Sequence, residues 1–171
     1  MSGEPGLRAL LSLDHGGIWL LSSAEVEVFD VLLDDASLLH RDPPAERSRL
    51  LTRRFVAAAV ARWWDQHDRE LLCAQIVLHR FVGPHDATLA AADGWIELAA
   101  GGAVIDEADG IRLAVMHEQS TDHDGALEHA ATFGSHGAVC YSVVASSPVL
   151  GDATRRVRFL AKAQFTALAG G

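Results

Sequence analysis

The sequence predicts a single all-α domain, a bundle of about six or seven helices. Apolar residues recur at spacings of three and four in most segments, which is the pattern of an amphipathic helix. Alanine is abundant, and Gly and Pro residues punctuate the chain between these segments. The 171 residues are 49% hydrophobic and 22% charged, the balance of one globular domain. We therefore expect one domain over residues 1–171 with a helical core at about 23–169.

The first two helices are predicted at 23–39 and 45–66, packed as an antiparallel hairpin. Ser22 and Glu25 fit a capping box at the start of the first helix. Asp42-Pro43-Pro44 separates the two, because a proline disfavours helical backbone in the residue before it. The first segment is acidic and the second rich in arginine, so ion pairs would bias their pairing. Each segment carries one apolar row: Val26, Phe29, Leu33 and Ala36 in the first, and Leu51, Phe55, Ala59 and Trp63 in the second.

Further helices are predicted at 86–99, at 122–133 and from about residue 152 to the C-terminus. Gly94 lies inside the first of these, where glycine costs roughly 1 kcal/mol relative to alanine, so we expect another helix to approach closely there.

Three segments are ambiguous between helix and strand. Residues 70–81 favour a helix, because no turn residue interrupts their apolar run. Residues 137–145 are β-branched but short enough to be a buried helix. Residues 103–118 form either a helix from Asp109 onward or a hairpin that turns at Ala108-Asp109-Gly110. The hairpin would make the fold α+β, which is the alternative to the helical bundle.

Net charge, cysteine content and the absence of long apolar runs argue against several classes of protein. The formal net charge is −9 and the pI about 5.3, which disfavours binding to nucleic acid or to an anionic membrane surface. Two cysteines, Cys73 and Cys140, do not make a disulfide framework. The N-terminal residues have no signal-peptide layout, and no apolar run is long enough for a membrane span. We expect a cytoplasmic protein, and the near-exclusive use of arginine over lysine suggests a bacterial source.

A cluster of histidines interleaved with carboxylates is the one candidate metal site. Imidazole and carboxylate are ligands for zinc, iron or manganese. Two ligands on one helix need a spacing of three or four residues to reach the same metal ion, and these histidines are six or seven residues apart. A solvated loop is therefore the preferred interpretation, and a metal-dependent enzyme that uses the His/carboxylate cluster at 117–136 is the alternative function. The cluster contains His117, His123, His129 and His136.

The remaining candidates are an inert pair of cysteines and an interface. Cys73 and Cys140 lie in apolar runs without a neighbouring base, so we expect both to be buried and unreactive. Adjacent tryptophans are frequent interface anchors, although one of two is usually core. A basic stripe on the last helix would suit an acidic partner. The interface candidates are Trp63, Trp64, Arg155, Arg158 and Lys162. The sequence contains no phosphate loop, dinucleotide fingerprint, HExxH or GxSxG motif, so we predict no catalytic residue and no cofactor.

The order of several segments resembles a family of small all-helical bacterial proteins of unknown function, some encoded near type VI secretion genes. The segments are Trp63-Trp64, the Cys73 run, Ala92-Asp93-Gly94-Trp95-Ile96, and residues 127–137 (LEHAATFGSHG), within about 50–168 of the chain. The resemblance implies an all-α fold and an interaction role, and it supplies no catalytic residue. Together with the missing motifs it predicts a non-enzymatic cytoplasmic interaction module, an accessory or adaptor subunit of a bacterial assembly with a protein partner.

Overall fold

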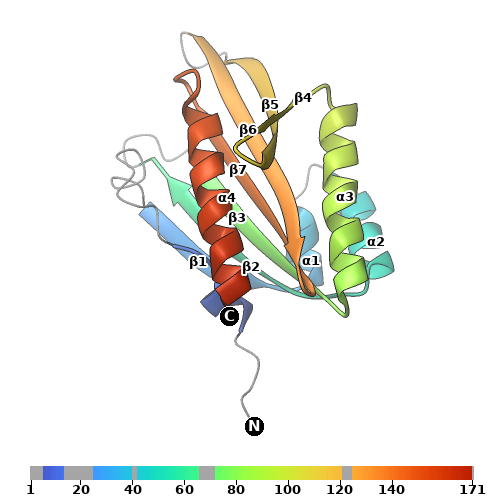
Figure 1. Cartoon of the computed structure of the whole chain (residues 1–171). Coiled ribbons are helices and arrows are strands. Elements are labelled where there is room, and N and C mark those ends of the chain that lie inside the picture. Colours follow the sequence, from blue (N-terminus) through green and yellow to red (C-terminus); the bar gives the residue numbers. More distant parts are fainter. Residues whose placement is uncertain (1–5, 14–24, 40–41, 66–71, 121–124, 171) are drawn as a thin grey trace.

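The computed structural model describes residues 6–13, 25–39, 42–65, 72–120 and 125–170. Within these ranges the chain forms one seven-stranded antiparallel sheet with helices on both faces (Figure 1). The strand order is β1-β2-β3-β7-β6-β5-β4. The strands are β1 (Glu25–Val31), β2 (Phe55–Trp64), β3 (Leu72–Phe81), β4 (Val104–Ala108), β5 (Ile111–Ser120), β6 (Gly125–His136) and β7 (Val139–Ser147).

The helices cover the two faces unequally. A 3₁₀ turn (Leu7–Leu10) precedes β1, and the α-helices are α1 (Leu33–Leu38), α2 (Pro43–Thr52), α3 (Pro84–Ala100) and α4 (Asp152–Gly170). One hydrophobic cluster joins α4 and the 3₁₀ turn to one face of the sheet, and a second joins α1, α2 and α3 to the other. Figure 1 shows α4 in front of the central strands, with α2 and α3 next to each other at the side. We call the two sides the α4 face and the α3 face.

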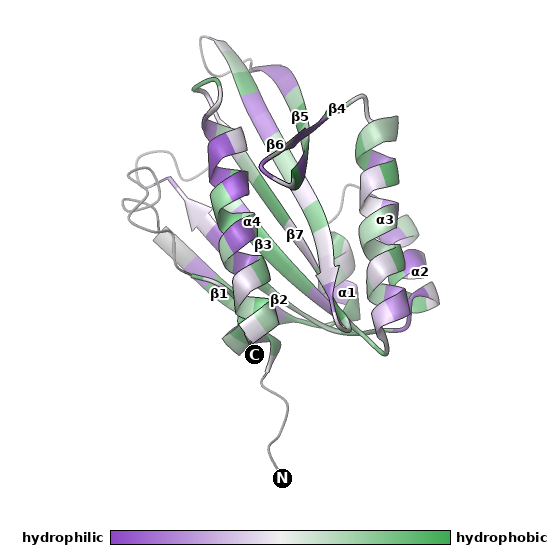
Figure 2. Cartoon of the chain, in the orientation of Figure 1, coloured by the Kyte–Doolittle hydropathy of each residue, from purple (hydrophilic) through white to green (hydrophobic). Residues whose placement is uncertain are grey.

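The all-α prediction is wrong, and the physical reason is that both faces of the central strands are buried. In β2, Ala58 and Val60 pack on the α3 face while Ala59 and Ala61 pack on the α4 face. Such a strand is a continuous apolar run without polar alternation. The predicted row at spacings of four does not distinguish helix from strand, because four is also a multiple of the strand period. In β3 the apolar run Ile76-Val77-Leu78 is likewise buried throughout, and Figure 2 shows a mainly hydrophobic strand with hydrophilic bands.

The other segments follow the same logic. The segment 70–81, predicted helical, contains β3, and 122–133, also predicted helical, overlaps β6. The segment 137–145 overlaps β7. In place of the helix predicted at 23–39, the chain forms β1 followed by the short α1. In place of the helix predicted at 45–66, it forms α2 followed by β2. The hairpin alternative at 103–118 is present as β4 and β5, with Asp109 and Gly110 at positive φ. Helices predicted at 86–99 and after 152 are confirmed as α3 and α4.

Local signals were more reliable than the overall class. Asp42 caps α2 by accepting a hydrogen bond from the Ala45 amide at 3.2 Å, and Pro43 opens the helix. Part of the predicted acidic–basic pairing is present, as an Arg47–Asp34 ion pair at 2.8 Å between α2 and α1. Ser22, proposed for a capping box with Glu25, lies outside the described residues.

Candidate ligand-binding cleft

A cleft of about 770 Å³ lies on the α3 face of the sheet, between α2 and α3. Its floor is made by alternate residues of the central strands, and its walls by the inward residues of the two helices. Most of these side chains are apolar. The floor includes Val77, Phe133, Cys140, Ser142 and Val144, and the walls include Leu50, Ala90 and Leu98.

The register of the sheet determines which side chains lie next to one another on the floor of the cleft. Cys140 of β7 pairs with His79 of β3 on one side and with Ser135 of β6 on the other, so one row crosses three strands. Gly94 lets α3 approach this floor, because a Cβ there would lie 2.6 Å from the Phe133 ring. The predicted close approach at Gly94 is therefore confirmed, although the neighbour is a strand rather than a helix.

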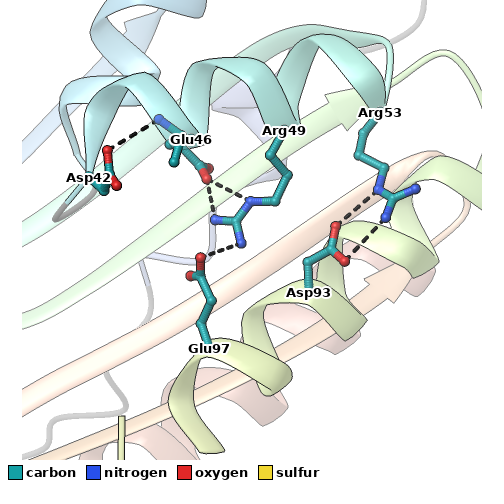
Figure 3. A network of polar contacts seen from close by, with 7 residues as sticks. Asp42, Glu46, Arg49, Arg53, Asp93 and Glu97 are labelled. Carbon is teal, nitrogen blue, oxygen red and sulfur yellow. Dashed lines mark hydrogen bonds and ion pairs between the residues drawn. The ribbon is translucent and has the colours of Figure 1, made fainter. Parts of the chain in front are cut away.

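Ion pairs connect α2 to α3 along the edge of the cleft (Figure 3). Arg49 of α2 contacts the buried Glu46 on its own helix and reaches Glu97 of α3 at 2.7 Å. Arg53 makes a two-pronged contact with Asp93 of α3, at 3.0 and 3.2 Å. We call these five residues the ion-pair bridge. A bidentate, partly buried pair is stronger and more directional than a single surface contact. The bridge therefore holds the two walls at a fixed separation.

His79 is the unusual polar group of the cleft. Its Nε2 atom is buried and has no hydrogen-bond partner, and its ring packs edge-on against Phe55 and Phe81 at 5.8 and 6.3 Å. Burial, and secondarily the positive charge of Arg49, lowers the pKa of His79 to about 4. The ring is therefore neutral at pH 7 and offers one donor and one acceptor to whatever occupies the cleft. A buried nitrogen without a partner is costly unless a ligand or water satisfies it.

The environment of Cys140 suppresses the nucleophilicity of its thiol. Burial raises the pKa of its thiol to about 12, and Glu46 adds to the effect. A thiol in that state is a weak nucleophile at neutral pH. The burial predicted for Cys140 and Cys73 is confirmed.

The structure distributes the predicted histidine cluster over both faces of the sheet. His117 is paired in register with Glu128, whereas His129 is paired with Met116 and points to the opposite face. His136 stacks edge-on against Phe165 of α4 at 5.9 Å. His123 lies outside the described residues. Among the residues that the structure describes, no three His, Cys, Asp or Glu side chains come together as a metal site. The metal-enzyme alternative stays a prediction of the sequence.

The predicted interface residues are partly engaged in the fold. Trp63 is 1% exposed in the core, and Trp64 donates from Nε1 to Glu27 at 3.0 Å. Arg155 contacts Asp152 on its own helix, Arg158 is half-buried and Lys162 is exposed. A protein partner, a cytoplasmic location and a place in a bacterial assembly stay predictions.

Sequence reasoning missed the residues that shape the cleft. The helix predicted at 70–81 gives His79 no special role, and the arginine-rich segment at 45–66 is predicted to pair with the acidic residues at 23–39 rather than with Asp93. The available signal was His79 directly after the apolar run Ile76-Val77-Leu78. The contacts between α2 and α3 join residues about 40 positions apart, as in Arg53–Asp93, and no local pattern predicts them.

The fold and cleft define a sheet-and-helix protein with a ligand-sized hollow on the α3 face, and comparisons with known proteins add little to that. No family model and no curated protein matches the chain. One similar solved structure is the crystal structure of the extracellular domain of PknH from Mycobacterium tuberculosis. It is 14% identical with a TM-score of 0.46, over 84% of this chain and 86% of that one. No described helix has both the length and the apolar character that a membrane crossing requires. The resemblance to the helical family is untested, and its all-α fold is not the fold of this chain.

Proposed function

We propose that the chain is a non-enzymatic binding module that takes up a small, mainly apolar, uncharged molecule in the cleft between α2, α3 and the sheet. The observation that carries the proposal is a cleft of about 770 Å³ whose apolar lining contains a neutral, buried and unpartnered histidine nitrogen. Ligand sites are typically apolar hollows of roughly 300–1,000 Å³ with a few placed polar groups.

Charge around the cleft supports an uncharged ligand. The two arginines that line it, Arg49 and Arg53, are both ion-paired in the bridge. Carboxylates outnumber them along the same edge, and the whole chain carries −9. An anionic ligand would meet net repulsion and would have to displace an existing carboxylate from an arginine.

The cleft lining, as far as the structure describes it, favours binding without chemistry. The one thiol of the floor, Cys140, has a raised pKa, and His79 remains neutral to about pH 4. His79 then supplies a hydrogen bond that orients the ligand, while the surrounding apolar side chains supply most of the binding energy.

A cavity-filling substitution tests the proposal. We expect the native chain to bind the neutral dye N-phenylnaphthylamine with a saturable rise in fluorescence. Ser142→Phe places a ring on the cleft floor, where Ser142 is half-buried. It should weaken dye binding about tenfold or more, equivalent to about 1.4 kcal/mol of binding free energy.

The matched control is Ser48→Phe, the same exchange at an exposed position of α2 that does not line the cleft. Thermal unfolding shows whether both variants are folded. The proposal fails if the native chain does not bind the dye saturably, or if both folded variants bind it with the native affinity.

A further inference from the structure

A second hollow of about 330 Å³ continues the cleft along the α3 face. It lies past the C-terminal end of α3, over β5, β6 and β7. The two hollows share three lining residues, Leu98 of α3, Met116 of β5 and Val144 of β7. Because the same apolar side chains line both, the hollows are adjacent, with Val144 between them, and we refer to the pair as the trough.

The register of β7 sets the length of this trough. Cys140 is opposite His79, and Ser146 is opposite His129. These positions are six residues apart on one strand, which corresponds to about 20 Å of extended backbone. A compact ligand would occupy only one end of such a trough.

Both ends carry a histidine whose buried Nε2 atom makes no hydrogen bond, although that of His129 lies within ion-pair distance of Glu118. Nε2 of His79 has no hydrogen-bond partner, and neither has Nε2 of His129. The His129 Nδ1 atom lies 2.8 Å from Ser146 Oγ, and Glu118 Oε2 lies 3.3 Å from Nε2 without the alignment of a hydrogen bond. Between these ends the shared lining is apolar. Polar ends and an apolar middle match an elongated chain with a polar group at its end.

Charge limits the ligand further. Glu118 lies at the outer end, and Glu46 and Glu97 lie beside the inner part. The arginines nearby are occupied by the ion-pair bridge. A carboxylate or phosphate headgroup therefore has no free cation among the described lining residues, whereas a hydroxyl or carbonyl can hydrogen-bond to a neutral imidazole.

We propose that the two hollows hold one elongated, uncharged amphiphile: a single alkyl or isoprenoid chain that lies along β7, with a hydroxyl or carbonyl group at the His79 end. This ligand class rests on the proposed function and specifies it. Apolar burial would supply the affinity, so affinity should grow with chain length until the trough is full.

The test is a series of primary alkanols from hexanol to dodecanol, measured by displacement of the neutral dye. For the native chain we expect each added methylene to tighten binding about three- to fourfold up to dodecanol. Val144→Trp should block the passage between the two hollows, so that the affinity stops rising near octanol. Leu98→Trp, from the opposite wall, provides a second block should Val144→Trp not fold. The control is Val104→Trp, which is 70% exposed on β4 and lines neither hollow.

The outcomes separate this inference from the proposed function. The elongated ligand is wrong if alkanols bind the native chain but their affinity does not rise beyond octanol. It is also wrong if the affinity of a folded blocking variant rises with chain length as much as that of the native chain. In either case the proposed binding module stands. If no alkanol displaces the dye, and the dye itself does not bind, both fail. Dodecanoate should bind at least about tenfold more weakly than dodecanol. Equal affinity of the two would overturn the uncharged class.

Discussion

Acidification should destabilise the native chain through His79 more than it destabilises a His79→Phe variant. The pKa of His79 is lowered from 6.5 to about 4 in the folded chain, mainly by burial. Between those two values the unfolded chain takes up a proton that the folded chain does not, so the free energy of unfolding falls as the pH falls. Well above pH 6.5 the imidazole is neutral in both states and contributes no pH dependence.

The expected size follows from about 1.4 kcal/mol per pKa unit, which gives a loss of about 2–3 kcal/mol between pH 7 and about pH 4.5. Urea unfolding of both proteins at the two pH values measures it. Other titrating groups act equally in both, and their effect cancels in the difference. Phe is suited to the site because the ring already packs against Phe55 and Phe81. If the free energy of unfolding changes equally with pH in the two proteins, His79 is not held neutral in the folded chain.

Glu128→Ala should lower the free energy of unfolding by about 3 kcal/mol. Glu128 is 4% exposed on β6, and its carboxylate accepts hydrogen bonds from the amides of Gly151 and Thr154, at 2.8 and 3.1 Å. These amides lie at the start of α4, where backbone donors have no partner within the helix. Removing the carboxylate leaves both donors unsatisfied and removes a charge from the positive end of the helix dipole.

Glu128→Gln is the matched control, because the amide keeps one acceptor oxygen and loses the charge. We expect it to lose roughly half as much stability as Glu128→Ala, measured by denaturant unfolding at neutral pH. A Glu128→Ala protein within about 0.5 kcal/mol of the native chain would show that the carboxylate does not hold α4 in place. The sequence presented this residue as a neighbour of possible metal ligands, and only the fold reveals it as a helix cap contributed by a strand.

The fold class was mispredicted because strands buried on both faces have continuous apolar sequences, which are also typical of buried helices. Ala58, Ala59 and Ala61 of β2 have high helix propensity, yet they occupy a strand because small side chains let helices and strands pack closely on both faces. The segment Glu25-Val26-Glu27-Val28 carried the opposite signal, a strict alternation of polar and apolar residues that is typical of a strand. Signals from backbone chemistry, such as Asp42-Pro43 and Asp109-Gly110, were correct because they depend on the local chain alone.

The cleft was not predictable by the same means. Its floor combines alternate residues of β3, β6 and β7, and its walls come from α2 and α3. Several of these elements are far apart in the sequence and meet only in the folded sheet. A reader of the sequence could have singled out His79 as a polar residue in an apolar run. The neutrality of that histidine depends on burial by Phe55 and Phe81 and on the nearby Arg49, which only the assembled sheet and α2 provide.

The most direct measurement is amide chemical-shift mapping of the isotope-labelled chain during titration with decanol. The account predicts saturable shifts that concentrate on the α3 face, at His79, Cys140 and Val144, with the α4 residues Val157 and Leu160 unchanged. Shifts that are absent at saturating decanol, or that cluster around α4 instead, would contradict a ligand site between α2, α3 and the sheet.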